Sequence, residues 1–547
     1  MATESTTAEK QSQEVASAQS STRMNIDIED STPRPAKLRR DLQGRHMQMI
    51  AIGGSIGAGL FVGSGRSLAV GGPASLTLGF IITGFAVLCT TQALGELAVM
   101  YPVNGAFYSY VVRFIDPAWY VNTSCRYALG WLITLPFEII SVGITINYWH
   151  EYNIGIWVAV FLTTIAFVQF FGVRGYGEIE FVLGIIKLVA VAGFIIFGII
   201  ANCGGVPTDT RGYLGFRYWS GDDGNHAFRN GFPGFCSVFV LSAFAFGGTE
   251  LVGLAAAEAQ DPQKSLPKAV KQVLWRIAGV YVLSTLILGI IVPNNSPELL
   301  GASGANTKAS PFVLAFKIAG VKALPSIFNA VITISTLSVA NSCTYGSTRT
   351  LQALAQYSMA PKILGYVDNR GRPLVAIIIQ LLVGLLAFIS YSAQAGTVFT
   401  WLFSISGLGI LLLWASICLC HVRFRQAWKV AGRPVEDLPF RSPLGVYGSY
   451  FALVLIALIL VLTFYVALIP PGGSPNAQYF FQNWLSGPIA LTAFGLRKAW
   501  TSDWRFGVKI KDMDLDTGRR DTGYTSRLSQ EEEKGKSLGR RVINAIF

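Results

Sequence analysis

Charged residues are scarce in this chain: only 14% of its 547 residues are Asp, Glu, Lys or Arg, whereas 52% are hydrophobic. Soluble globular domains contain about 25% charged residues, so this composition excludes a soluble multidomain protein and indicates a polytopic membrane protein. The formal net charge is +12, and an excess of Lys and Arg is expected in the cytosolic loops of a membrane protein. The positive charge therefore gives no support to nucleic-acid binding.

Catalytic and metal-binding patterns are also absent. The chain has four histidines, all at the ends of apolar segments or in loops, and no Ser/His/Asp order, HExxH motif or phosphate-binding loop. Its seven cysteines form no CxxC pair, so neither a zinc site nor a disulfide framework is predicted. Cys203 and Cys236 can be either bridged or free thiols. We therefore expect no enzyme activity, no metal and no cofactor.

The two ends of the chain lack apolar segments. Residues 1–45 are rich in Ser, Thr, Glu and Gln, which excludes a cleaved signal peptide and predicts a disordered cytosolic tail. Residues 501–547 form a second polar tail. A solvated tail is the simpler interpretation, but ubiquitin-dependent trafficking machinery could also modify lysines in these tails. Those lysines include Lys10, Lys37, Lys534 and Lys536.

Residues 46–500 form the predicted transporter core, in which apolar stretches approach the roughly 20 residues that cross a bilayer. Twelve such segments lie near residues 48–70, 74–100, 127–149, 154–172, 179–201, 235–259, 277–293, 324–348, 373–391, 397–419, 447–469 and 480–500. An even number of membrane-spanning segments places both tails on the same side of the membrane. The loops after even-numbered segments carry most of the Lys and Arg, counting Arg126, Arg276 and Arg349, so that side is predicted to be cytosolic. We expect an all-α protein with twelve membrane-spanning helices.

Glycines interrupt two of these segments at corresponding places. The first contains Gly53-Gly54-Ser55-Ile56-Gly57-Ala58-Gly59, and the sixth contains Phe244-Ala245-Phe246-Gly247-Gly248-Thr249-Glu250. Within a bilayer, unwound backbone is tolerated only where it is buried in protein or lines a cavity. A matched pair of interruptions indicates a transporter substrate site built on inverted repeats. Glycines that merely let helices pack closely are the alternative.

The polarity of the two interruptions predicts the ligand. The amides of Gly57 to Gly59 would begin a half-helix, where free N–H groups favour a carboxylate. Carbonyls near Phe244 to Phe246, helped by those of Ser55 and Ile56, would favour an ammonium group. Donors on one side and acceptors on the other suit a zwitterionic α-amino acid. The Phe244 and Phe246 rings are candidates for covering the site, although packing is the commoner role of such rings.

Four charged residues stand out inside the apolar segments, where each is costly unless it is paired or hydrated. Lys187 should lie at the level of the first interruption, where burial disfavours its charged form, so it is the first candidate for proton coupling. Glu250, directly after the second interruption, is the next candidate. Glu138 is either a third coupling group or a static hydrogen-bond partner between helices. Glu96, toward the cytosolic end of its segment, is expected to be hydrated and structural.

Several stretches taken together resemble the fungal amino-acid permease family, close to the general amino-acid permeases, within the amino acid, polyamine and organocation transporter superfamily. They are Arg45 to Gly54, Gly95 to Ala98, Leu135 to Glu138, Phe246 to Gly253, Ala257 to Ala259 with Pro262 to Lys268, and Ile417 to Phe424. The resemblance covers roughly residues 40–520. It implies a leucine-transporter-like fold of five-plus-five inverted repeats with two additional helices. It also implies proton-coupled import of amino acids across a fungal plasma membrane.

The resemblance also assigns residues. The family's substrate loops fall on Ser55 to Gly59 and on Phe244 to Gly247, its acidic residue on Glu250, and a lysine implicated in proton coupling in bacterial relatives on Lys187. Permeases restricted to basic amino acids tend to carry Gln where Gly247 stands, so broad or neutral-preferring specificity is expected. The implied partners are an amino acid, protons and the lipid bilayer. Two alternatives stay open: an amino-acid sensor with the same fold, and an amino-acid or polyamine exchanger of an internal membrane.

Overall fold

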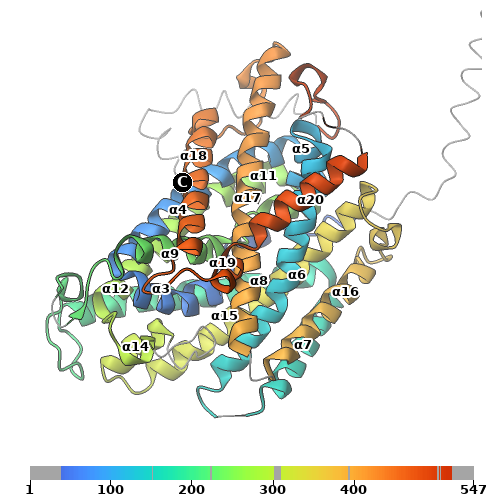
Figure 1. Ribbon diagram of the computed structural model, residues 1–547. Helices are drawn as coiled ribbons and strands as arrows, with labels where there is room; N and C mark the ends of the chain where they lie inside the picture. Colours follow the sequence, from blue (N-terminus) through green and yellow to red (C-terminus); the bar gives the residue numbers. More distant parts are fainter. Residues whose placement is uncertain are drawn as a thin grey trace, which may run out of the picture.

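The computed structural model describes residues 38–150, 152–221, 224–300, 310–391, 395–501, 504 and 507–519. Throughout these residues the regular structure is helical, with one isolated β-bridge between Leu42 and Ala259, and the helices pack into one bundle (Figure 1). Eight helical stretches of the described chain are long and apolar enough to cross a membrane. They are Pro73–Met100, Pro117–Gly143, Gly172–Asn202, Gly231–Glu258, Pro262–Ile291, Leu324–Gln356, Gly407–Val430 and Gly445–Leu468. The all-α polytopic fold class is therefore confirmed.

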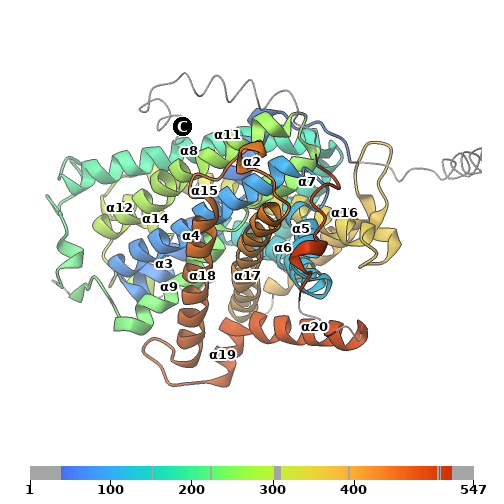
Figure 2. The same ribbon diagram turned by 90° about the horizontal axis from the view of Figure 1, so that it is seen from above.

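Helices also occupy the other four predicted segments, where they are shorter or broken. The first segment consists of α2 (Gly44–Gly53), the π-helix η2 (Gly59–Gly63) and α3 (Ser64–Gly71). The fourth is α7 (Ile154–Gln169), and the ninth is α16 (Leu374–Gly384) with the 3₁₀-helix η9 (Leu385–Tyr391). The twelfth is divided into α19 (Ala477–Trp484) and α20 (Ser486–Thr501), and α20 lies against α6 (Pro117–Ile146) at the edge of the bundle (Figures 1 and 2).

Two predicted segments start about ten residues or more too late, and the tenth, predicted to end near residue 419, continues to Val430. The third segment begins at Pro117 rather than near residue 127, because Asp116 caps α6 by accepting hydrogen bonds from the amides of Ala118 and Trp119. The seventh continues a helix that starts at Pro262, where Asp261 is the N-cap. Polar residues lie within the first three turns of both helices, at 122–126 in the third segment and at 263–268 in the seventh, so an apolar window starts too late. Arg126 and Arg276, which we counted as loop charges, therefore lie within helices.

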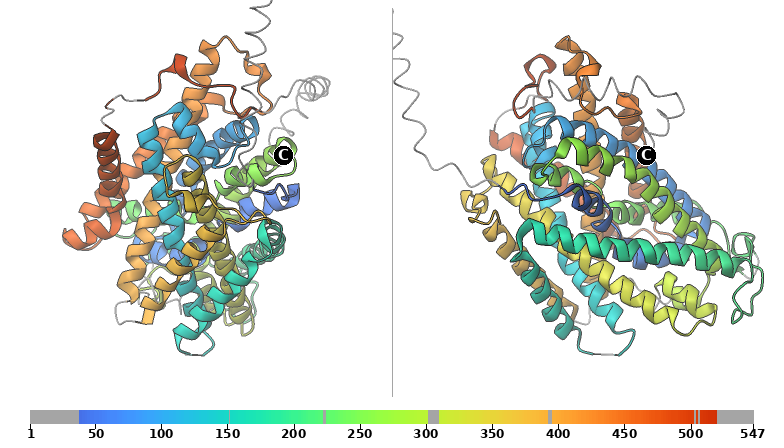
Figure 3. Two further views of the ribbon diagram at one scale, coloured as in Figure 1. Left: turned by 90° about the vertical axis from the view of Figure 1, so that its right-hand side faces the viewer. Right: turned by 180° about the vertical axis from the view of Figure 1, so that it is seen from behind.

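The second interrupted segment begins with α9 (Gly231–Phe246). The two interrupted segments are surrounded by the long helices α4 (Pro73–Met100), α8 (Gly172–Asn202), α15 (Leu324–Gln356), α17 (Ala395–Val430) and α18 (Gly445–Leu468). Helix α6 packs along both α15 and α17, and α8 crosses the bundle in contact with α2 and α15 (Figure 3). The interruption in the first segment is thus enclosed by α8 and α15. Helix α6 lies between α15 and α17.

The described parts of both predicted tails pack against the same end of the bundle, which we name the tail end. There Leu42 is 1% exposed, and its amide donates to the carbonyl of Glu258 over 3.0 Å. Nearby in the fold, Asn104 donates to the side chains of Gln352 and Gln356 at the end of α15. Residues 507–519 lie against Ile115 and Tyr101. Residues 1–37 and 520–547, with the lysines named above, lie outside the described residues.

Candidate functional site

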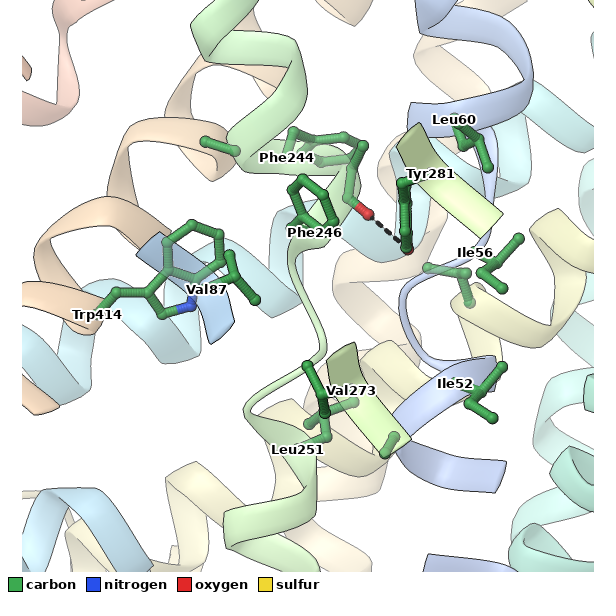
Figure 4. Close-up of a cluster of buried hydrophobic side chains, with 14 of the residues drawn as sticks. Ile52, Ile56, Leu60, Val87, Phe244, Phe246, Leu251, Val273, Tyr281 and Trp414 are labelled. Carbon is green, nitrogen blue, oxygen red and sulfur yellow. Dashed lines mark hydrogen bonds between the residues drawn. The ribbon is translucent and has the colours of Figure 1, made fainter. Parts of the chain in front are cut away.

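Both predicted interruptions are present. Helix α2 ends at Gly53, and residues 54–57 form a turn before helical structure resumes. Helix α9 ends at Phe246, and four residues form a second turn before α10 (Leu251–Ala255). Figure 4 shows the two connections at the same level of the bundle, with Tyr281 between them.

The two interruptions touch each other through glycine. Gly248 has a φ of 95°, which glycine adopts readily and other residues rarely do. A Cβ atom at Gly248 would collide with the carbonyl oxygen of Gly54, and one at Gly59 would lie 2.9 Å from the Cα atom of Ala245. Close backbone contact therefore accounts for two of these glycines, as the packing alternative proposed. Gly54, Gly57 and Gly247 line an open space, and Gly59 lines it as well.

That space is a cavity between α6, α15, α17 and the two interruptions, with about 500 Å³ not filled by atoms when its opening to solvent is included. Its lining consists of Gly54, Ser55, Gly57, Gly59, Arg126, Tyr127, Gly130, Trp131, Thr134, Glu138, Phe244, Gly247, Val339, Gly409 and Ile410. The structure thus brings Ser55, Gly57, Gly59, Phe244, Gly247 and Glu138 together around one cavity.

The other predicted lining residues are buried behind the cavity wall. They are Ile56, Ala58, Ala245 and Phe246. The ring of Phe246 packs against Phe80 and Tyr281, with centroids 5.6 and 4.4 Å away, so of the two phenylalanines only Phe244 reaches the cavity. The carbonyl of Ala245 already accepts a hydrogen bond from the Tyr281 hydroxyl over 3.0 Å (Figure 4).

Lys187 lies beside the first interruption, fully buried on α8. Its ammonium donates to the carbonyl of Gly53, the last residue of α2, over 2.6 Å and to the Ser338 hydroxyl of α15 over 2.8 Å. The Ser338 hydroxyl in turn donates to Oε2 of Glu180 over 2.7 Å. The ammonium therefore links α8 to the interruption and to α15.

Glu180 is a buried carboxylate that the sequence analysis missed. It is fully buried and also accepts from the Asn341 amide over 3.4 Å. Glu180 precedes Lys187 by seven residues, which places the two side chains on one face of α8. That spacing was available in the sequence, but Glu180 stands at the margin of its predicted segment.

Glu250 and Glu138 are both buried near the cavity but have different surroundings. Glu250 accepts hydrogen bonds from the Tyr127 hydroxyl over 3.0 Å and from the Trp414 indole over 3.4 Å. Glu138 lies against the amide of Ala58, and its Oε2 atom has no hydrogen-bond partner among the described residues. Glu250 is thus held by neighbouring helices, whereas Glu138 presents a free acceptor at the first interruption.

Glu96 is structural but not hydrated, which corrects part of our expectation. It is fully buried, and its carboxylate pairs with Arg425 at 2.5 Å and with His421 at 2.9 Å. The Ser442 amide donates to it as well. His421 lies inside α17 rather than at a segment end. Arg425, His421 and the Ser442 amide offset the cost of burying the Glu96 carboxylate.

Three arginines that we assigned to loops belong to helices. Arg276 is buried and donates to the Thr249 hydroxyl, inside the second interruption, over 2.6 Å. Arg349, near the end of α15, pairs with Glu258 at 3.2 Å. Arg126 lines the cavity. Charged residues at helix ends look like loop residues in a hydropathy profile, so only tertiary structure separates these cases.

All seven cysteines are free thiols, including Cys203 and Cys236. Within the described parts of the chain, no group of three or more His, Cys, Asp or Glu side chains could hold a metal ion.

Comparison with known proteins fits this geometry. The family model described as amino acid permease matches residues 46–509, a range that contains both interruptions and every cavity residue. The chain belongs to the amino acid permease family. This permease is therefore a multi-pass membrane protein of an amino-acid transporter family and not an enzyme.

Individual relatives are similar over nearly the whole permease. An uncharacterized amino-acid permease of Schizosaccharomyces pombe is 51% identical over 93% of this chain and 86% of its own length. The general amino-acid permease GAP1 of Saccharomyces cerevisiae is 47% identical over 92% of this chain and 83% of its own. Cationic amino acid transporter 1 of S. pombe is 47% identical over 93% and 86%. Relatives named for general and for cationic substrates are thus equally similar, so overall identity does not define the substrate range.

Proposed function

We propose that the permease imports amino acids across the plasma membrane by alternating access, coupled to protons and with broad or neutral-preferring specificity. The observation that carries this proposal is the pair of interrupted helices that meet around one cavity. Main-chain donors and acceptors at such interruptions are suited to the charged groups shared by all α-amino acids. A site that recognises these shared groups accepts amino acids with many different side chains.

In this proposal the amides that begin the half-helix after Gly57 bind the substrate carboxylate, since the first amides of a helix have no partner within it. The substrate ammonium group binds opposite them. The carbonyls that end α9 are one acceptor, and the unpartnered Oε2 atom of Glu138 is a second. Phe244, packed edge-on against Phe137 with ring centroids 5.2 Å apart, covers the substrate.

Proton coupling is proposed to depend first on Lys187. Its hydrogen bond to Gly53 joins the first interruption to α8. Loss of its proton would weaken that connection, because a neutral amine donates a weaker hydrogen bond than an ammonium group does. Glu180, reached through Ser338, is a nearby group with which a proton can be exchanged. Glu250 and Glu138 are the remaining candidates, and Tyr127 links Glu250 to the cavity wall.

Both termini are proposed to be cytosolic. Residues 38–43 and 507–519 pack at the same end of the bundle, as an even number of spanning helices requires. Basic residues in the connections at this end, such as Arg39, Arg370 and Arg441, follow the positive-inside rule.

Uptake of labelled leucine, lysine, glutamate and proline at pH 5 and pH 7.5 tests the function. The expected result is accumulation of several of these amino acids that is greater at pH 5 and is abolished by a protonophore. Uptake indifferent to the proton gradient would remove the coupling. Uptake seen only when the opposite side is preloaded with amino acid would identify an exchanger instead.

A further inference from the structure

Arg126 has no role in the site described so far, although it lines the same cavity. It belongs to α6, and its guanidinium atom Nη2 is buried without a hydrogen-bond partner. No carboxylate of the described residues pairs with it. The side chain as a whole is half-buried, but a buried guanidinium atom without a partner is unfavourable. Arg349, by contrast, pairs with the carboxylate of Glu258. A ligand in the cavity would supply the partner that the Nη2 atom lacks.

The position of Arg126 on α6 connects it with the proposed substrate site. Arg126, Gly130, Thr134 and Glu138 follow one another at intervals of four residues, so they form one stripe along the helix, and all four line the cavity. A Cβ atom at Gly130 would meet nothing within 4 Å. No atom therefore obstructs the stripe at Gly130, between Arg126 and Glu138.

The guanidinium is also close to the second interruption. Its Nη2 atom lies 3.9 Å from where a Cβ atom of Gly409 would be, on α17. The next residue, Ile410, packs directly over Gly247 of the interruption. Gly409, which lies next to Arg126, is thus adjacent in sequence to Ile410, which contacts the proposed substrate loop at Gly247.

We propose that Arg126 forms a subsite for an anionic substrate side chain, so that glutamate and aspartate belong to the range of the permease. This inference rests on the proposed function, because it takes the cavity as the amino-acid site. The main chain would bind the groups common to all substrates, and the side chain would extend along the stripe toward Arg126. A guanidinium binds a carboxylate through two parallel hydrogen bonds. The same charge repels the side chains of lysine and arginine.

Competition against uptake of labelled leucine tests this subsite at pH 6.5, where the glutamate side chain is ionised. The quantity measured is the inhibition constant of glutamate divided by the KM of leucine. Because hydrogen bonds to charged groups are among the stronger ones, we expect Arg126→Gln to raise this ratio about tenfold or more. Arg126→Lys, which keeps the charge but cannot make two parallel hydrogen bonds, should restore part of the inhibition by glutamate.

Arg174→Gln is the matched control, since Arg174 is exposed on α8 and does not line the cavity. It should leave the ratio unchanged. An unchanged ratio in Arg126→Gln, or an equal rise in Arg174→Gln, would overturn the subsite.

The unmodified permease gives a second test that needs no variant. Lysine should compete at least about tenfold more weakly than glutamate, and equal or stronger competition by lysine would overturn the subsite. Absence of any leucine uptake by the unmodified permease would instead refute the proposed function, so the two failures are distinguishable.

Discussion

Lys187 joins α8 to the first interruption and to α15 through two hydrogen bonds. Replacing Lys187 should therefore uncouple transport from the proton gradient. We expect Lys187→Ala to reach the membrane but to accumulate leucine equally at pH 5 and pH 7.5. Lys317→Ala is the control, because Lys317 is an exposed lysine on α14 (Pro311–Ile318). Full pH-dependent accumulation by Lys187→Ala would refute its role in coupling.

Gly57 lines the cavity at the point where the amides are proposed to bind the substrate carboxylate. Even a Cβ atom there would lie 2.6 Å from the Val339 side chain, and overpacking of this kind costs about 1–3 kcal/mol. We expect Gly57→Val to reduce leucine uptake about tenfold or more. Gly193→Val on α8 is the control, because a Cβ atom there meets nothing within 4 Å. Equal uptake by both variants would mean that the interruption only assists packing.

The segment before α2 and the end of the second interrupted segment pack together and form a closure, that is, a set of contacts that closes the tail end of the bundle. Glu258 binds Arg349 at 3.2 Å and accepts from the Tyr345 hydroxyl over 2.6 Å. The Tyr345 ring stacks on Tyr176 of α8, with centroids 4.5 Å apart. Leu42 pairs with the backbone next to Glu258. Alternating access requires such contacts to open when the cavity connects to this end.

We therefore expect Glu258→Gln to loosen the closure. Removing one partner of a buried ion pair costs about 3–5 kcal/mol because the other charge is left buried. Hydrogen exchange should become faster at the amides of Leu42 and Gln260, which form the bridge, and should not change at Gly72 and Tyr101, whose amides bond within other elements. Unchanged exchange at Leu42 would contradict a closing role for the pair.

The elements that the sequence predicted well are those with an unbroken apolar run. Helices α4 and α18 match their predicted segments within about three residues, because apolar length is a local property. The two interruptions were also predictable, since glycine in an apolar helix is a local anomaly. The partners of buried charges were not, because Glu96 and Arg425 are 329 residues apart. Arg126 shows the same limit, because its cavity is lined by α6, α15, α17 and both interruptions, which only the fold brings together.

At the level of the whole molecule, Asp116 fastens the C-terminal segment to the helical core. It accepts from Lys498 of α20 over 2.8 Å and from the Gly507 amide over 3.2 Å. Burial alone would raise the pKa of this carboxyl, but Lys498 and the Gly507 and Ala118 amides outweigh that effect and hold the pKa below its usual value. The stabilisation is therefore present at neutral pH, and it is lost only as the pH falls through this lowered pKa.

Asp116→Asn should release residues 507–519 while keeping the helix cap, since Asn caps helices as well as Asp does. The expected result is faster hydrogen exchange at the Val508 amide, which donates to the Ile115 carbonyl. The unmodified permease should lose this protection only below about pH 4. Asp512→Asn, at an exposed position in the same segment, should change nothing. Unaltered exchange at Val508 in Asp116→Asn would show that other contacts hold the segment.

The central claim is that the two interruptions bind the charged groups of an amino acid, and a structure of the permease determined with bound leucine tests it most directly. The account predicts the leucine carboxylate within hydrogen-bonding distance, about 3 Å, of the amides at Gly57 to Gly59. It places the ammonium group between the end of α9 and Glu138. Leucine bound elsewhere, or two continuous helices with no cavity between them, would contradict it.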